Sequence, residues 1–220
     1  MYLIVLFFEI GSLFSLLSIF YLIYNIYRRK HTEGISFNSQ LLYAISHYAR
    51  LFYFPFTSLV EYKFSWLIII ISVIFPTIIL IQMVKYTPLS SSLEKNKVDY
   101  RIIILIAFIL SVISNYSKEY DWSNSQLALR FSIILESFAL LPQLLLMKKE
   151  QYIQQFIGYY ILFITISRVF RILFWISQYQ DNNDISYKSL FIADGIYIVL
   201  TADFIYRLIK HRKSNLIPFN

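Results

Sequence analysis

The stretch LESFALLPQLLLM (residues 135–147) is apolar enough to enter a lipid bilayer, yet it carries Glu136, Pro142 and Gln143. At membrane depth, a carboxyl group and a helix-breaking imide are costly unless they face a cavity or a partner. Six further apolar stretches of comparable length run through the chain. We therefore expect a helical membrane protein in which this stretch carries polar groups for a functional reason.

The composition supports a membrane protein built as one domain over residues 1–220. Of the 220 residues, 58% are hydrophobic and only 15% are charged, and the mean hydropathy is +0.57. These values lie outside the range of soluble globular proteins and leave no room for an extramembrane domain. With no cysteine and only three scattered histidines, we expect no metal and no cofactor. The sequence contains no glycine-rich phosphate loop and no serine elbow, so we expect no enzyme.

About 20 apolar residues are needed for one membrane-spanning helix, and on this basis the fold is all-α with seven transmembrane helices. The predicted spans are Tyr2–Tyr27, Ser39–Val60, Phe64–Met83, Ile102–Asn115, Leu127–Met147, Phe156–Ile176 and Leu190–Ile209. The fourth is the shortest.

Basic residues support this number of spans. Alternate connections and the tail carry twelve lysines and arginines, against three on the opposite side: Lys63, Lys118 and Lys188. Cytoplasmic loops are enriched in such residues, which predicts a lumenal N-terminus and a cytoplasmic tail over residues 210–220. The net charge of +7 therefore reflects topology and lipid headgroups, and we expect no nucleic-acid partner.

Ionisable residues inside the predicted spans are the candidates for a binding site. Each costs roughly 2.5–3.5 kcal/mol at a span centre, so they must pair or line water. Arg168 and Arg171 share one helix face and repel each other unless anions are supplied, by Glu136, by Asp194 or by a ligand carboxylate. Alternatively, the two arginines extend toward the headgroups. The full set is Glu9, His47, Arg50, Glu136, Arg168, Arg171, Asp194 and Asp203.

His47 shares a helix face with Arg50 and is a candidate for tuning ligand binding with pH, because histidine normally titrates near pH 6.5. The alternative is a histidine that only hydrogen-bonds a neighbouring helix. Pro142 bends its helix, which opens space at the bend. Gln143 is then available to satisfy the freed carbonyl or to face a cavity.

Three segments carry a resemblance to a known family: GISFNSQLLYAISHYARLF (34–52), FSIILESFALLPQLLLM (131–147) and ADFIYRL (202–208). In this order and spacing, they resemble the ER lumen protein-retaining receptors, which recognise Lys-Asp-Glu-Leu or His-Asp-Glu-Leu tails. The resemblance implies two inverted three-helix repeats plus one helix, similar to SWEET and PQ-loop transporters. It also implies binding of escaped ER proteins in the Golgi at lower pH, and retrograde return in coat-protein-I vesicles to the ER.

Residue by residue, the resemblance is partial. Arg50 matches the family's signal-contacting arginine, and further matches fall at Glu136, Pro142, Gln143, Arg168 and Trp175. Polar or charged residues of the family's pocket are replaced at Phe8, Ser15, Ser167, Phe174 and Gln178.

Two interpretations follow from this mixture. In the first, the protein is a receptor whose pocket is rebuilt: Arg50, Glu136, Arg168, Arg171 and Trp175 bind the peptide tail, and His47 senses pH. In the second, it is a paralogue without signal binding or a PQ-loop-like transporter of a small solute. Candidates for trafficking contacts with coat protein are Asp203, Lys210, Arg212 and Lys213, although Asp203 can equally form a simple pair with Arg207 four residues on.

Overall fold

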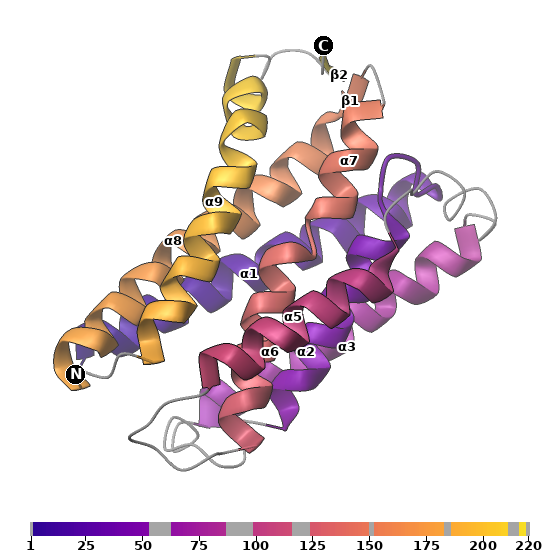
Figure 1. Cartoon of the computed structure of the whole chain (residues 1–220). Helices are drawn as coiled ribbons and strands as arrows, with labels where there is room; N and C mark the ends of the chain where they lie inside the picture. Colours follow the sequence, from indigo (N-terminus) through magenta and orange to yellow (C-terminus); the bar gives the residue numbers. More distant parts are fainter. Residues whose placement is uncertain are drawn as a thin grey trace.

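The computed structural model describes residues 2–52, 63–86, 99–115, 124–149, 152–182, 186–210 and 216–218. These residues form a bundle of helices and one two-stranded ribbon (Figure 1). The helices are α1 (Tyr2–Arg29), α2 (Phe37–Leu51), α3 (Lys63–Tyr86), α5 (Tyr100–Asn115), α6 (Asn124–Phe138), α7 (Leu141–Lys149), α8 (Gln155–Asn182) and α9 (Ser186–Lys210). Each predicted span coincides with helix in the part of the chain that is described.

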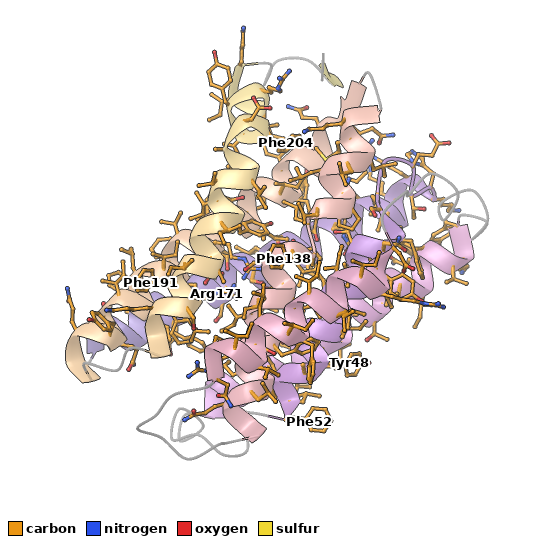
Figure 2. The ribbon with its side chains drawn as sticks, viewed as in Figure 1. Tyr48, Phe52, Phe138, Arg171, Phe191 and Phe204 are labelled. Carbon is orange, nitrogen blue, oxygen red and sulfur yellow. The ribbon has the colours of Figure 1, made fainter. Side chains whose placement is uncertain are left out.

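Five segments are long and apolar enough to cross a membrane: Leu6–Arg29, Leu67–Tyr86, Gln126–Lys148, Gln155–Gln180 and Lys188–Lys210. Helix α5 is apolar but shorter. Large apolar side chains cover the outside of the bundle, as Tyr48 and Phe52 do at its edge, whereas Arg171 points into the interior (Figure 2). An apolar exterior around a polar interior is the arrangement expected in lipid.

Helix α2 differs from the others because its polar face is buried. It begins after Ser36, whose hydroxyl accepts a hydrogen bond from the Ser39 backbone N–H at 3.3 Å, a typical N-cap. It ends at Leu51, and residues 53–60 of the predicted second span lie outside the described residues. Five polar side chains of α2 are buried: Asn38, Ser39, Gln40, Ser46 and His47.

The predicted span over residues 127–147 lies within the apolar segment Gln126–Lys148, but its helix stops at Phe138 and restarts at Leu141. Pro142 has no N–H to donate to the carbonyl one turn back, so the helical hydrogen-bond ladder is interrupted there. The hydroxyl of Ser39 donates to the carbonyl of Ala139 at 2.5 Å, inside the interruption. The predicted bend at Pro142 is therefore present as a full break, closed by a side chain from α2.

The helices close into a ring. Helix α1 packs on α8, α8 on α9, α9 on α6, α6 on α2, α2 on α3, and α3 on α1, while α5 lies against α6. Helices α1 and α8 approach closely at Gly11, whose carbonyl accepts a hydrogen bond from the Ser167 hydroxyl at 2.6 Å. A Cβ at Gly11 would lie 3.2 Å from the Ser167 carbonyl oxygen, so glycine permits this contact.

The ribbon is a departure from the all-α prediction. Strand β1 (Tyr152–Gln154) pairs antiparallel with β2 (Leu216–Pro218), which brings the tail beside the start of α8. Arg29 donates to Gln154 Oε1 at 2.8 Å, so the end of α1 joins the same region. The start of α1 and β2 lie at opposite ends of the bundle (Figure 1).

Candidate functional site

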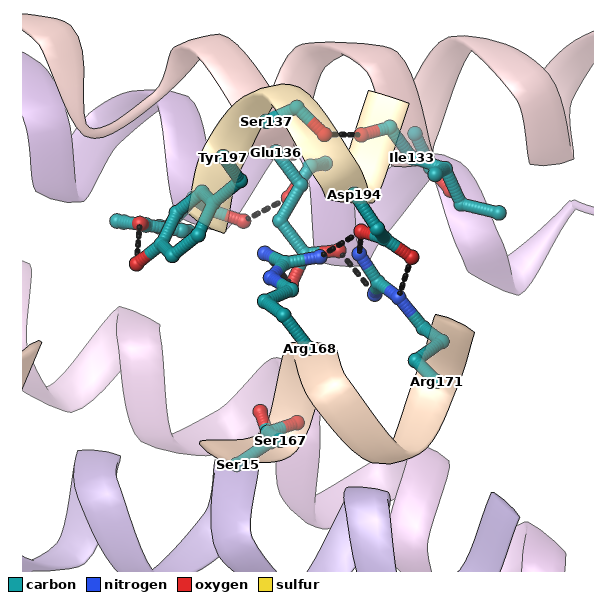
Figure 3. A network of polar contacts seen from close by, with 12 residues as sticks. Ser15, Ile133, Glu136, Ser137, Ser167, Arg168, Arg171, Asp194 and Tyr197 are labelled. Atoms are coloured by element: carbon teal, nitrogen blue, oxygen red, sulfur yellow. Dashed lines mark hydrogen bonds and ion pairs between the residues drawn. The ribbon is translucent and has the colours of Figure 1, made fainter. Parts of the chain in front are cut away.

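Figure 3 shows Glu136, Arg168, Arg171 and Asp194 close together inside the ring. With Arg50, five charged side chains from four helices meet there. They are Arg50 of α2, Glu136 of α6, Arg168 and Arg171 of α8, and Asp194 of α9. Only 1% of Arg168 and 0% of Asp194 is exposed, so this ionic cluster is buried. We refer to these five residues as the ionic cluster.

Glu136 is the carboxylate that joins the three arginines. Its Oε1 lies 2.7 Å from Arg168 Nη2, and its Oε2 lies 2.8 Å from Arg171 Nη1. Arg50 Nη2 forms a third ion pair with Oε2, and Arg50 Nε donates to the Ser132 hydroxyl at 3.3 Å. Glu136 is placed by the last turn of α6, immediately before the break at residues 139–140.

Asp194 forms the second centre of the cluster. Arg171 binds it through two nitrogens, with Nε donating to Oδ2 at 2.6 Å and Nη2 paired with Oδ1. Arg168 Nη1 donates to the same Oδ1 at 3.1 Å. This forked geometry is the strong mode of arginine–carboxylate pairing. The Arg168 guanidinium also lies 4.8 Å from the centre of the Tyr197 ring, a cation–π contact.

The charges of the cluster do not balance. Three guanidiniums face two carboxylates, and no third carboxylate pairs with these arginines among the residues that the structure describes. Burial weakens solvent screening, so an excess positive charge in this setting favours an incoming anion. The cluster is therefore suited to bind a negatively charged group.

A small pocket adjoins the cluster in the middle of the ring. Glu136 and Arg168 form part of its wall, together with His47 and neutral polar side chains such as Gln40 and Ser15. It has room for about one water molecule. Figure 3 shows Ser15 of α1 beside Ser167 of α8, next to the turn that carries Arg168. The pocket is thus small, and charged groups of the cluster form part of its wall.

His47 lies in the wall of this pocket with 2% of its surface exposed. Its Nδ1 has no hydrogen-bond partner. Both readings of His47, a pH-responsive group and a histidine that only hydrogen-bonds a neighbouring helix, stay predictions.

The structure brings four of the predicted ligand-binding residues into one cluster: Arg50, Glu136, Arg168 and Arg171. The alternative that Arg168 extends to the headgroups is wrong, because its guanidinium is buried between two carboxylates. Trp175, the fifth predicted residue, is also buried and interacts with Asp194 at the edge of the cluster.

Two positions at which the resemblance indicates lost polar residues are in contact with each other. The Phe8 and Phe174 ring centroids lie 5.4 Å apart, and Phe174 packs edge-on against Trp175 at 4.7 Å. Three aromatic side chains therefore pack together in the part of the bundle where the resemblance implies polar groups.

Gln143 takes neither of its two predicted roles. Its side-chain nitrogen donates to the Gly34 carbonyl and its oxygen accepts from the Ser36 N–H, both at 2.7 Å. These contacts attach α7 to the connection between α1 and α2. Gly34 itself has φ +80, a conformation that favours glycine.

The predicted pair of Asp203 and Arg207 is confirmed, with Nε 3.1 Å from Oδ2 on the surface of α9. Lys210 is exposed at the end of the same helix, whereas Arg212 and Lys213 lie outside the described residues. Asp203 and Lys210 do not belong to the ionic cluster.

From the sequence we predicted Asp194 as a possible counter-ion but not as a site residue. Ser132 and Tyr197 were not predicted. Ser132 lies four residues before Glu136, and Tyr197 three residues after Asp194. Both spacings place a side chain on the same helix face as the charge. This spacing is the signal that identifies them. No group of three potential metal ligands occurs in the described part of the chain.

A helical membrane bundle with an excess of guanidinium charge in its interior has the architecture expected of a receptor or carrier. Residues 31–178 match the model of the family described as ER lumen protein retaining receptor. The chain belongs to this family, which comprises receptors rather than enzymes.

Relatives from distant organisms agree. The ER lumen protein-retaining receptor of Plasmodium falciparum is 32% identical over 220 residues, which covers 96% of each chain. ER lumen protein-retaining receptor 2 of Gallus gallus is 29% identical over 211 residues, covering 94% of this chain and 96% of its own. Receptor A of Arabidopsis thaliana is 28% identical over 93% of this chain and 94% of its own. The likeness therefore extends over nearly the whole length.

Proposed function

We propose that this protein binds the C-terminal K/HDEL-type retrieval signals of soluble ER proteins in the Golgi and returns them to the ER by retrograde vesicle transport. The observation that carries the proposal is the net positive ionic cluster. A C-terminal tail offers a carboxylate, and Arg50, Arg168 and Arg171 are the groups that bind carboxylates most strongly. The small pocket requires that the ligand opens the cluster as it enters.

The topology we propose has seven spans, formed by two inverted three-helix repeats and one further helix. Five segments have the length and apolarity for a span, and α2 and α5 supply the remaining two. The start of α1 and strand β2 lie at opposite ends of the bundle, which fits an odd number of spans (Figure 1). Basic residues in the last turns of α1 and α9 support a cytoplasmic location for these helix ends.

Binding is proposed to strengthen as pH falls, through His47. Arg50 and Arg168 lie close to the imidazole, and Glu136, Tyr43 and Tyr160 share its pocket. A proton on His47 adds a positive charge beside the guanidiniums and so favours an anionic ligand. Because protonation of His47 favours binding, the ligand should be captured in the more acidic Golgi and released in the ER.

The decisive experiment measures binding of a peptide ending in His-Asp-Glu-Leu, with a free or an amidated terminus, at pH values of about 5.5 and 7.4 that bracket histidine titration. The free carboxylate should bind and the lower pH should tighten binding. Arg50→Ala should abolish binding, whereas Arg101→Ala, at an exposed position of α5, should leave it intact. Equal binding of free and amidated peptides would disprove the role of the arginines.

A small-solute transporter is the competing function, and the broken α6–α7 segment is the observation in its favour. Reconstitution into proteoliposomes separates the two. A transporter moves solute whether or not the peptide is present, whereas a receptor binds peptide with saturation and shows no flux.

Return to the ER requires a cytoplasmic contact with coat protein, for which Lys210, Arg212 and Lys213 are the proposed residues, with Asp203 nearby. Lys210 is exposed at the end of α9, where a basic tail also meets lipid headgroups. Replacing the three basic residues by alanine should slow recycling from the Golgi. Normal recycling of this variant would assign them to lipid contact and topology alone.

A further inference from the structure

Asp194 is a carboxylate that the chain itself supplies to two of the arginines proposed to bind the ligand. It is fully buried and accepts hydrogen bonds from two nitrogens of the Arg171 guanidinium. It also accepts a hydrogen bond from Arg168. A bidentate pair of this kind saturates the face of the arginine that a ligand carboxylate would use. Arg171 is therefore already neutralised before any ligand arrives.

The charge count of the cluster limits what a ligand can bring. With three guanidiniums and two carboxylates, the cluster carries one excess positive charge. With His47 neutral, a single terminal carboxylate brings the total to neutral. Each additional carboxylate leaves a net negative charge in a buried setting, where an uncompensated ion is strongly unfavourable.

The pocket walls agree with a ligand whose side chains are neutral. Beside the charged groups, the wall contains apolar residues and five neutral hydrogen-bonding side chains: Ser15, Gln40, Tyr43, Tyr160 and Ser167. Gln40 Nε2 donates to the Tyr160 hydroxyl at 3.1 Å, a contact that amide or hydroxyl groups of a ligand can exchange. Such groups match amide side chains as well as they match carboxylates.

We propose that Asp194 is a specificity-determining residue that occupies, on Arg168 and Arg171, the place of an acidic side chain of the ligand. The preferred tail then presents its terminal carboxylate to the cluster and neutral polar side chains at the positions before it. The inference rests on the proposed function, since it concerns which C-terminal tails the same site selects.

The test compares two peptides that differ only in charge, ending in His-Asp-Glu-Leu and in His-Asn-Gln-Leu, each with a free terminus. Both are titrated against the purified full chain in detergent. The wild type should bind the amide peptide at least as tightly as the acidic one. Asp194→Asn adds one net positive charge and should shift the affinity ratio toward the acidic peptide by about tenfold. Asp203→Asn, the same change at the exposed pair of α9, should keep the wild-type ratio.

Arg171→Gln provides a second measurement that stays informative if Asp194→Asn does not fold. It removes the excess positive charge and should shift the ratio in the opposite direction, against the acidic peptide. If neither variant changes the ratio of the affinities for the acidic and the amide peptide, the inference is overturned. A tenfold preference of the wild type for the acidic peptide also overturns it. In both cases the proposed function stands. If neither peptide binds the wild type, the proposed function fails and the inference fails with it.

Discussion

The substitution Glu136→Gln tests whether the ionic cluster holds the bundle together. Glutamine preserves the size of the side chain but removes the charge that three guanidiniums share, at distances of 2.7 and 2.8 Å for Arg168 and Arg171. The variant leaves Asp194 as the one carboxylate of the cluster among the described residues, against the buried Arg168 and the partly exposed Arg50 and Arg171. Removing one partner of a buried ion pair costs about 3–5 kcal/mol.

The expected loss is large enough for a thermal assay. For a chain of this length, 1 kcal/mol corresponds to about 2–4 °C in the midpoint of unfolding, so Glu136→Gln should lower it by about 10 °C. Intrinsic fluorescence in detergent can follow the transition, because Trp175 is buried beside the cluster. The control Asp203→Asn removes an exposed pair worth less than about 1 kcal/mol and should shift the midpoint little.

A double-mutant cycle with Arg50→Gln shows whether the loss comes from the ion pair itself. If the pair matters, the double variant should be more stable than the sum of the two single losses predicts, because both charges leave together. A Glu136→Gln midpoint no lower than that of Asp203→Asn would refute the reasoning. Exact additivity in the cycle would refute the direct coupling to Arg50.

Three further outcomes are expected. Gln143→Ala removes the partner of the Gly34 carbonyl and of the Ser36 N–H, and should lower the free energy of unfolding by about 2–4 kcal/mol in a thermal assay. The control Gln180→Ala, at an exposed position, should lower it by less than about 0.5 kcal/mol. Equal losses for the two variants would contradict the contact. Gly11→Val should separate α1 from α8 and destabilise the bundle. Gly195→Ala, whose added methyl group meets open space, should stabilise the bundle by about 0.5–1 kcal/mol. A Gly11→Val variant more stable than Gly195→Ala would contradict the packing. His47→Phe should bring the ratio of peptide affinities at low and neutral pH close to about 1, and a ratio like that of the wild type would exclude His47 as the pH-responsive group.

Sequence periodicity and hydropathy predicted the helices because lipid exposure imposes long apolar runs that are visible without tertiary contacts. Charge cost likewise predicted that Glu136 and the arginines of α8 must be paired. The contacts between segments distant in sequence were not predictable in the same way. Gln143 binds a loop 109 residues away in the chain, and no local pattern indicates a partner at that separation.

The ribbon and the helix break have similar explanations. Strands of three residues, such as Tyr152–Gln154, are too short to show a period of two, so nothing in the sequence favoured β1 over a turn. The break required Ser39 to close the backbone at Ala139 from another helix. A proline in the sequence predicts a bend, but whether the helix stops depends on such a partner.

The wide sequence separation of the cluster's partners has a consequence for how the protein is made. Synthesis proceeds from the N-terminus, so Arg50 enters the translocation machinery 86 residues before Glu136, and Arg168 follows 26 residues before Asp194. An unpaired arginine in the bilayer costs about 2.5–3.5 kcal/mol. Helix α2 must therefore wait in a hydrated or protein-lined environment until α6 arrives, and the two arginines of α8 have only Glu136 as a carboxylate partner until α9 arrives. The final helix acts as the assembly step that completes charge pairing, and a chain truncated before residue 194 should be retained as an unassembled intermediate and degraded.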